Sequence, residues 1–368
     1  MDNLVTVDVS AVPRKPTGVG RYAIELLSAV APLVREDMTI GTCVSSSNSQ
    51  LFEGLGEPVH TFIESPGSRG LRLIWEQSVL PRRLNLASSR VHHGLHYTIP
   101  MTYRGATVVT VHDMTLITHP TWHQRSKALF FQRAIRYAAN RADVIVVPSY
   151  DTERKLKDIL SPKGEVVVVP HGVKVRSEPN FNESGRIKRT EPYLLFVGTI
   201  EPRKSVETLV RAFEEVAVKS DGLRLVVAGL PGWKADEAKT ALERSRFRDR
   251  IDVLGFVGDD ELVGLYKNAA VFVYPSLEEG FGLPVLEAMA YFVPIVTTKN
   301  SAMEEVAQGY ASLVAGKDVE GLADAIVKEL EAPESNRQDR MTIAKERLSI
   351  YTWERSARGH LAIYESLL

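Results

Sequence analysis

Short apolar runs alternate with helical patterns along this 368-residue chain, and this alternation constrains the fold more than any other feature. Runs of four to six residues rich in Val, Ile and Leu are typical of buried parallel strands. They occupy residues 4–9, 108–111, 144–147, 166–169, 193–197, 223–228 and 271–274. Apolar residues recur at helical spacing over residues 22–33, 126–139, 206–218 and 284–290. The alternation predicts α/β units with parallel sheets.

A polar stretch, residues 174–192, divides the chain almost in half and has the composition of a linker. Each half restarts with a strand and a glycine-bearing turn. We therefore expect two Rossmann-like, doubly wound domains, residues 1–175 and 190–350, that face a central cleft. Residues 351–368 form an amphipathic helix, which we expect to pack back on the first domain. The alternative is an ordinary last helix of the second domain.

Composition and charge exclude several classes of protein. The first 178 residues carry 21 basic and 16 acidic side chains, whereas the remainder carries 24 and 30. The basic half favours phosphate or an anionic membrane surface as a partner, but its excess is too small for nucleic acid. The single cysteine, Cys43, cannot form an internal disulfide. Because there is no long apolar run and no signal-peptide pattern, we expect a cytoplasmic protein, at the inner face of the cytoplasmic membrane if lipid is bound.

Two glutamates flank a glycine turn in the segment 275–290, P-S-L-E-E-G-F-G-L-P-V-L-E-A-M-A. The segment follows an apolar strand and opens a helix with a proline in its first turn. Gly280 and Gly282 let backbone amides approach a ligand, and amides at a helix start suit a diphosphate. Glu279 and Glu287 can then hold polyhydroxylated groups on either side of it. The competing interpretation is a glycine turn with two solvated glutamates.

Arg203 and Lys204 follow the strand at 193–197, in the turn that begins the next helix. A planar guanidinium and a point-like ammonium both suit a leaving diphosphate. The competing interpretation is an ordinary pair of charges at a helix start.

Gly18 and Gly20, in the run T-G-V-G-R-Y, could bring a loop of the first domain close to the same diphosphate. The run G-V-G-R-Y-A also fits the dinucleotide fingerprint G-x-G-x-x-A, which makes a dehydrogenase an alternative. However, residues 11–16 separate the strand from the glycines and spoil the tight turn that the fingerprint requires.

Histidines gather in the first half of the chain. His112 and Asp113 follow a strand directly, where ligands bind in such sheets. Five others raise the hypothesis of a metal site: His92, His93, His96, His119 and His123. A glycine interrupts H-H-G-L-H and no carboxylate cluster accompanies it, so we favour loop histidines near an acceptor cleft. No D-x-D occurs in the sequence, so we expect diphosphate chemistry without a metal ion.

Taken together, these segments resemble retaining glycosyltransferase family 4, nucleotide-sugar transferases with the GT-B fold, whose signature is E-x7-E. The other matches follow in the order of the family: residues 17–22, 111–114, 147–149 (V-P-S), 169–173 (V-P-H-G-V), 196–204 (F-V-G-T-I-E-P-R-K), 254–257 (L-G-F-V) and the W-E-R-S-A tail. The opening glycine loop and V-H-D-M look like the subgroup that contains mannosyltransferase B-like enzymes of polysaccharide and O-antigen assembly.

The resemblance implies a role for each half. The second domain would bind the donor and the first domain the acceptor, with the cleft closing over both. Arg203 and Lys204 would neutralise the leaving nucleoside diphosphate, while Glu279 orients the sugar hydroxyls and Glu287 the ribose. The implied donor-binding residues are Gly18, Gly20, Gly198, Arg203, Lys204, Val257, Glu279, Gly280, Phe281, Gly282, Leu283 and Glu287.

On the acceptor side the resemblance implies that His112 contacts the transferred sugar, with Asp113 beside it. His171 stands where the family often carries Asn, and we expect it to line the cleft. Two basic segments, 68–84 and 124–141, are predicted amphipathic helices that either lie on anionic lipid or are solvated helices with core faces.

The activity implied is retaining transfer of a hexose, mannose from GDP-mannose or a related GDP-deoxyhexose, to a lipid-linked or oligosaccharide acceptor. The substrates would be the nucleotide sugar and the glycan, with no cofactor, no metal ion and no nucleic acid. The alternatives are a UDP-sugar-dependent transferase, a sugar-nucleotide epimerase on the same fold, and a non-catalytic nucleotide-sugar-binding subunit.

Overall fold

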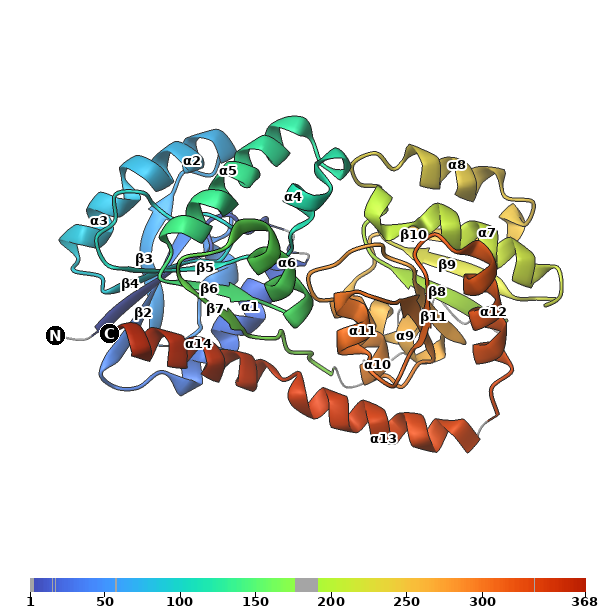
Figure 1. Ribbon diagram of the computed structural model, residues 1–368. Coiled ribbons are helices and arrows are strands. Elements are labelled where there is room, and N and C mark those ends of the chain that lie inside the picture. Colours follow the sequence, from blue (N-terminus) through green and yellow to red (C-terminus); the bar gives the residue numbers. More distant parts are fainter. Residues whose placement is uncertain (1–2, 15, 17, 57, 176–190, 334) are drawn as a thin grey trace. The chain divides into compact units, whose positions relative to one another are not determined.

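The computed structural model describes residues 3–14, 16, 18–56, 58–175, 191–333 and 335–368 (Figure 1). The chain forms two compact units. The first contains Met1–Thr118, Arg125–Gly172 and Tyr351–Leu368, and the second contains His119–Gln124 and Val173–Ile350. The chain therefore passes between the units four times. Thr17 of the predicted glycine loop, and residues 176–190 of the predicted linker, lie outside the described residues.

A parallel sheet of seven strands forms the centre of the first unit, in the order β3-β2-β1-β4-β5-β6-β7. The strands are β1 (Asn3–Asp8), β2 (Met38–Ser45), β3 (Val59–Ser65), β4 (Val91–Gly94), β5 (Ala106–Thr110), β6 (Val144–Val147) and β7 (Glu165–Val168). The strand order reverses between β1 and β4, because β2 and β3 are added on one side of β1 and the later strands on the other. Central strands such as β6 are buried along their whole length, as expected where helices cover both faces.

The helices of the first unit come from both ends of the chain. They are α1 (Val19–Val30), α2 (Arg69–Ser78), α3 (Leu80–Leu86), α4 (Thr115–Thr118), α5 (Arg125–Arg141), α6 (Tyr150–Leu160) and α14 (Trp353–Leu367). Helix α14 packs against α1, and its Leu361 and Tyr364 share a buried core with Leu26 and Leu27. A Cβ on Gly172 would lie 2.2 Å from the backbone nitrogen of Trp353, so only glycine allows this approach.

The second unit contains a parallel sheet of six strands in the order β10-β9-β8-β11-β12-β13. The strands are β8 (Tyr193–Val197), β9 (Arg224–Ala228), β10 (Ile251–Gly255), β11 (Val271–Tyr274), β12 (Ile295–Thr298) and β13 (Ser312–Val314). Here the order reverses between β8 and β11. The helices are α7 (Val206–Ala217), α8 (Asp236–Arg244), α9 (Asp259–Asn268), α10 (Leu283–Ala290), α11 (Ala302–Val306), α12 (Val319–Leu330) and α13 (Ser335–Ile350).

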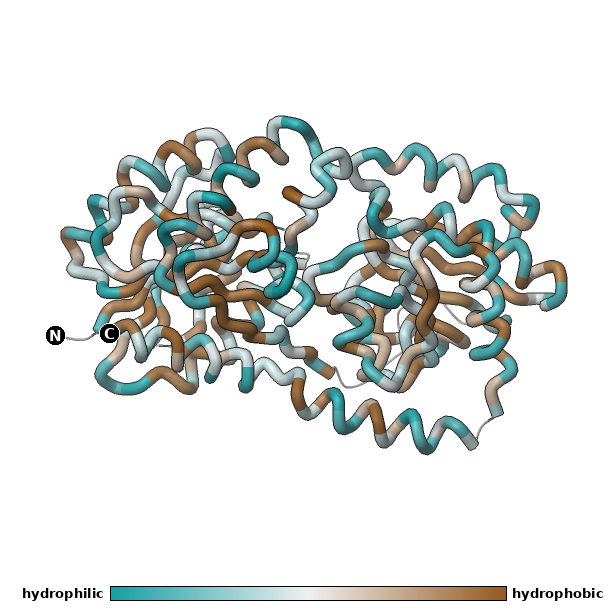
Figure 2. The backbone as a smooth tube through the Cα atoms, in the orientation of Figure 1, coloured by the Kyte–Doolittle hydropathy of each residue, from teal (hydrophilic) through white to brown (hydrophobic). Residues whose placement is uncertain are grey.

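The predicted α/β fold with two Rossmann-like sheets is confirmed. Apolar residues follow the strands of each sheet and one side of the surrounding helices (Figure 2). One expectation is wrong: His92 and His93 lie in β4, buried in the sheet, and not in a loop. Among the described helices, none combines the length and apolarity that a bilayer-spanning segment needs.

Candidate active site

The strongest candidate site lies at the carboxyl ends of β8 and β11, the neighbouring strands at which the order of the second sheet reverses. Arg203 and Lys204 follow β8 in the 3-10 turn η4 (Pro202–Lys204), and Glu279 follows β11. Doubly wound folds bind their ligands in the crevice outside such a switch point. Chain topology therefore brings Glu279 next to Lys204, which lies 75 positions earlier in the sequence, and to the adjacent Arg203.

The Glu279 carboxylate is the centre of this cluster. Its Oε2 atom pairs with Arg203 Nη1 at 2.5 Å. Its Oε1 atom pairs with the Lys204 ammonium and accepts hydrogen bonds from Ser276 Oγ at 2.7 Å and Tyr274 OH at 3.1 Å. Both oxygens of this carboxylate thus face donors, which fixes its orientation.

Burial alone would raise the pKa of Glu279, but the charges of Arg203 and Lys204 outweigh it and lower that pKa to about 2. Glu279 is therefore ionised at neutral pH. Burial lowers the pKa of Lys204, as does the neighbouring Arg203, although Glu279 opposes both. Arg203 also pairs with Glu201 at 2.7 Å, so two carboxylates balance the two cations.

The turn between Glu279 and α10 allows close approach of the backbone. Gly282 caps α10 with a φ of 97°, a conformation that favours glycine, and no side chain caps this helix. Leu283 is the first residue of α10, Phe281 is buried, and Gly280 completes the turn. An uncapped helix start with its amides outward suits an anion.

Gly198 follows β8 directly and approaches the neighbouring loop. A Cβ on Gly229 would lie 1.8 Å from the Gly198 carbonyl oxygen, so the loops after β8 and β9 pack without side chains between them. The L-G-F-V segment, residues 254–257, begins inside β10, since Leu254 and Gly255 belong to that strand. Val257 follows in the loop before α9 and is half-buried.

Glu287 lies in the second turn of α10, beyond the glycine turn from Glu279. Its Oε2 atom accepts a hydrogen bond of 2.9 Å from the buried Tyr266 hydroxyl. The hydrogen bond holds a half-buried carboxylate in place while leaving it further acceptor capacity.

In the first unit, His112 and Asp113 follow β5 and precede α4. The Nε2 atom of His112 donates a hydrogen bond of 2.7 Å to the Leu95 carbonyl, and burial lowers the pKa of this histidine. The ring is then neutral, with Nδ1 as its acceptor. Asp113 accepts from the amide and hydroxyl of Thr115 at 2.9 and 2.6 Å, so it caps the start of α4.

Different structural constraints explain why positions 18 and 20, in the loop before α1 and at its start, are glycines. Gly18 adopts a φ of 47° at the start of α1. A Cβ on Gly20 would lie 2.8 Å from the Cβ of Pro16, so close packing explains Gly20 without a ligand. The His171 ring is buried, with its centroid 4.5 Å from that of the Tyr22 ring, and its expected position in a cleft stays a prediction.

Histidines and tyrosines form a second buried cluster in the first unit. Tyr22 OH bonds to His360 Nε2 at 2.9 Å, and His93 Nδ1 bonds to Tyr364 OH at 2.7 Å. The other nitrogen of His93 lies 2.8 Å from Thr110 Oγ1. These hydrogen bonds attach α14 to the sheet and to α1. Among the described residues, no group of three or more His, Cys, Asp or Glu could hold a metal ion.

Two family models match the chain in succession. The model described as Glycosyltransferase Family 4 matches residues 16–177, and the one described as Glycosyl transferases group 1 matches residues 177–347. The chain is a glycosyltransferase with the GT-B fold. The expected enzyme class is therefore confirmed.

Relatives of this glycosyltransferase agree over most of its length. O-antigen chain mannosyltransferase B from Escherichia coli is 26% identical over 95% of this chain and 96% of its own. A GDP-mannose-dependent alpha-(1-6)-phosphatidylinositol dimannoside mannosyltransferase from Mycobacterium tuberculosis is 27% identical over 67% and 66%. Sucrose-phosphate synthase from Thermosynechococcus elongatus superposes with a TM-score of 0.75, at 18% identity over 99% of each chain.

Three residues around Glu279 were not predicted from the sequence. Tyr274 and Ser276 donate to its carboxylate, and Glu201 pairs with Arg203. The available signal was their position: Tyr274 ends a buried strand, Ser276 follows it, and Glu201 begins the turn that carries the cations. Polar residues at strand ends are the ones that a sheet presents to a ligand.

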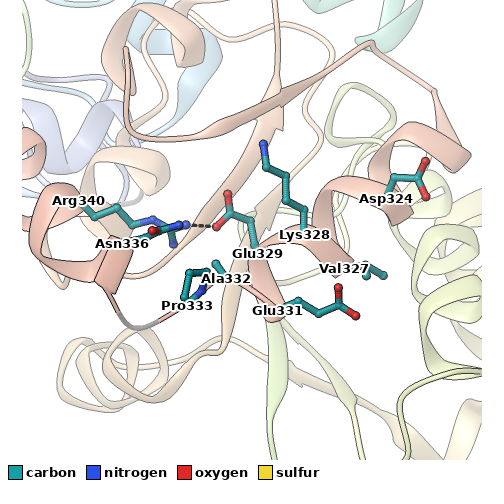
Figure 3. Close-up of a pocket in the computed structure, with 9 residues that line it drawn as sticks. All are labelled: Asp324, Val327, Lys328, Glu329, Glu331, Ala332, Pro333, Asn336 and Arg340. Atoms are coloured by element: carbon teal, nitrogen blue, oxygen red, sulfur yellow. Dashed lines mark hydrogen bonds and ion pairs between the residues drawn. The ribbon is translucent and has the colours of Figure 1, made fainter.

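A pocket of about 450 Å³ lies elsewhere in the second unit, between α12 and the start of α13 (Figure 3). Its lining includes Glu329 and Arg340, which pair with each other, and Glu329 also accepts from Ser312 Oγ at 2.6 Å. No predicted site residue of the glycosyltransferase lines this pocket. Its charged side chains serve the local fold.

Proposed function

We propose that this glycosyltransferase transfers mannose from GDP-mannose, or a related GDP-deoxyhexose, to a lipid-linked or oligosaccharide acceptor in polysaccharide or O-antigen biosynthesis. Transfer would retain the anomeric configuration. The mannosyltransferase names of the relatives support the donor, and one of those names specifies GDP-mannose. The observation that carries the proposal is the Glu279, Arg203 and Lys204 cluster at the switch point of the second sheet.

Donor binding would exchange the partners within this cluster. The diphosphate takes the place of Glu279 opposite Arg203 and Lys204, so neither buried cation loses its counter-charge. The released carboxylate of Glu279 then accepts hydrogen bonds from the sugar hydroxyls. Gly280 to Leu283 supply amides at the start of α10 for the remaining phosphate oxygens. Glu287, held by Tyr266, accepts from the ribose.

In the proposed reaction, the bond between the sugar C1 and the diphosphate oxygen breaks, and the acceptor oxygen bonds to C1. The acceptor proton passes to an oxygen of the leaving diphosphate. Negative charge grows on that leaving group, where Arg203 and Lys204 are already in place to stabilise it. We propose that these two cations act instead of a metal ion.

The acceptor side would be built on the first unit. The neutral His112 ring offers Nδ1 to a sugar hydroxyl, while Asp113 holds the turn in place. The outer helices of the first unit expose apolar side chains beside arginines. Such a surface suits a lipid-linked acceptor at the cytoplasmic membrane. The exposed apolar residues are Leu71, Ile74, Leu86, Leu129 and Phe130. Trp75 and Phe131, which the basic amphipathic segments also contain, are buried core residues.

The test of donor identity is a thermal-shift panel of GDP, UDP, ADP and their sugar conjugates in EDTA, followed by transfer to a panel of glycan acceptors. A ligand that binds only the native state raises its apparent stability. We expect GDP and GDP-mannose to shift the unfolding temperature and a mannosylated product to form. A UDP-selective shift overturns the donor. Conversion of the nucleotide sugar without an acceptor indicates the epimerase, and binding without any product indicates a non-catalytic subunit.

Membrane association is tested by sedimentation with vesicles that contain phosphatidylglycerol. Ile74→Asp should release the protein from the vesicles, because a charge replaces an apolar side chain that is 66% exposed. Val218→Asp is the matched control, since Val218 is 57% exposed on α7's end in the second unit. Equal sedimentation of wild type and Ile74→Asp would contradict the membrane role.

A further inference from the structure

A short segment of the chain belongs to the second unit although both its neighbours belong to the first. Residues His119–Gln124 lie between α4 and α5, yet they group with the second unit. The segment contains the 3-10 turn η3 (Pro120–Trp122). Its contacts with other parts of this unit include His119 Nδ1 with Glu278 Oε2, and a hydrogen bond of 3.1 Å from Lys234 Nζ to the Thr121 carbonyl. Residue 119 lies six positions after Asp113, so the segment continues directly from the acceptor-side motif.

The His119 ring is held in one orientation. It stacks on the Trp122 ring with centroids 3.9 Å apart and an angle of 6° between the planes. Its Nδ1 atom lies 3.0 Å from Glu278 Oε2. At this distance the Nδ1–H of an imidazole can donate a hydrogen bond to a carboxylate oxygen. The stack therefore aims a donor at Glu278.

Glu278 is held at its side chain and at its backbone. Its carboxylate is almost fully buried, with 7% of the side chain exposed. Its carbonyl oxygen accepts from Arg203 Nη1 at 3.3 Å and from Ser276 Oγ at 3.5 Å. The peptide that follows is the one that carries Glu279, so the orientation of Glu278 sets the direction in which the Glu279 side chain leaves the backbone.

We propose that His119 and Glu278 are positioning residues that hold Glu279 in place for the donor sugar. The inference rests on the proposed donor site. When a diphosphate occupies Arg203 and Lys204, Glu279 loses both cationic partners and keeps only Ser276 and Tyr274. The Glu278–Glu279 peptide then determines where the carboxylate points, and His119 fixes that peptide through the Glu278 side chain.

The proposal predicts different effects on the two parts of the donor. The cations stand on η4, between Pro202 and the start of α7, and the contact of Arg203 with Glu278 is to the backbone carbonyl, which every variant keeps. Binding of the nucleoside diphosphate alone should therefore survive the loss of His119. Contacts to the sugar should not, since a displacement of about 1 Å in a positioned group can cost roughly 100-fold in rate.

The experiment compares His119→Ala, His119→Asn and Glu278→Ala with wild type in the full chain. Calorimetry measures Kd for GDP and for GDP-mannose, and initial rates of transfer separate kcat from KM. Lys234→Met is the matched control, because it removes the other hydrogen bond of the same segment without touching Glu278. Asn at 119 can restore a donor near the position of Nδ1.

For His119→Ala and Glu278→Ala we expect the Kd for GDP to stay within about two-fold of wild type. The Kd for GDP-mannose should rise and kcat should fall, each by roughly ten-fold, with recovery in His119→Asn. Unchanged binding and transfer in His119→Ala overturns the inference, as does an equal loss of both ligands in His119→Ala and Lys234→Met. Failure of the wild type to bind any nucleotide overturns the proposed function instead, and this inference with it.

Discussion

The two units share a doubly wound architecture but use opposite kinds of buried polar cluster. In the first unit, Tyr22, His93, His360 and Tyr364 are joined by hydrogen bonds between neutral groups. Burial holds the pKa of His93 well below its ordinary value, so the ring stays uncharged. In the second unit, Glu279 meets Arg203 and Lys204 as ions, and its pKa is lowered to about 2.

The two clusters differ in how readily their groups can exchange partners. Neutral hydrogen bonds in a dry core satisfy their partners completely and are costly to break, which suits the attachment of a helix. A buried ion pair contributes little net stability, because desolvation offsets the attraction. Such charges can change partners when a charged substrate arrives. We therefore infer that the first cluster stabilises the fold and that the second is the one available to a substrate.

The largest effect on activity is expected from Glu279→Ala, which tests the role of the charged cluster in transfer. We expect kcat/KM for transfer to fall by about 1,000-fold, or roughly 4 kcal/mol, because the sugar loses its orienting carboxylate. Global unfolding should change far less than activity. Steady-state transfer kinetics and a thermal melt measure the two. Glu354→Ala is the control, since Glu354 pairs with Arg358 on an exposed face of α14. Wild-type transfer rates in Glu279→Ala would contradict the assignment of the active site to this cluster.

Low pH should affect the stability of the two clusters differently in the wild-type protein. Burial lowers the pKa of His92 and His360 to about 4 and that of His96 to about 3. Unfolded histidines titrate near 6.5, so below this pH the unfolded chain binds protons that the native first unit excludes. Stability of that unit therefore falls as the pH drops from about 6.5 to about 3, by about 2 kcal/mol for each of these rings between pH 7 and 5.

The second unit should respond differently over the same range. The pKa of Glu279 lies at about 2, so its ion pairs persist at pH 5 and weaken only as the pH falls from its ordinary range toward 2. Hydrogen exchange at pH 7 and pH 5, corrected for the intrinsic rates, reports both units at once. We expect protection in α14 to drop while protection in α7 is retained. Equal loss in both helices would contradict the assignment of acid sensitivity to the first cluster.

Tyr364→Phe tests the neutral cluster alone. It removes the hydroxyl that bonds to His93 Nδ1 and leaves a buried ring nitrogen without that partner. We expect about 1–2 kcal/mol less stability in the first unit, seen as faster exchange in α14. Transfer activity below the melting temperature should be unchanged. A variant that lost donor binding instead would mean that the first cluster also serves the site.

The smallest effect should come from Tyr266→Phe. The change removes the hydrogen bond to Glu287 but keeps the buried ring. We expect a loss of about 1 kcal/mol in the affinity for the nucleoside diphosphate, or roughly five-fold in Kd, because Glu287 is less well oriented toward the ribose. Calorimetry with GDP measures it. Unchanged affinity would contradict the proposed contact between Glu287 and the ribose of the donor.

Local patterns predicted the fold and the charged cluster well. The Glu279 turn is recognisable because its glycines, its proline and the strand before it are adjacent in the sequence. The assignment of Arg203 and Lys204 to the same site follows from topology, since both segments end strands of a doubly wound sheet. The donor and the residue roles depend on the resemblance and stay predictions.

The neutral cluster could not be predicted in the same way. His93 and Tyr364 are 271 residues apart, and nothing local in either segment indicates the partner. The segment around His92 and His93 contains polar side chains and a glycine, a composition typical of a loop. Only the surrounding sheet shows that both residues belong to a short buried strand. His119 presented a similar problem, because its contact with Glu278 depends on which unit the segment joins.

The return of the last helix to the first unit has a consequence for biosynthesis. Because α14 supplies part of the core around α1, the core of the first unit is incomplete until residues 351–368 have been synthesised. The second unit, which ends at Ile350, is synthesised before this helix. The half that begins first is therefore finished last, and a chain truncated before Tyr351 keeps a whole second unit beside an unfinished first one.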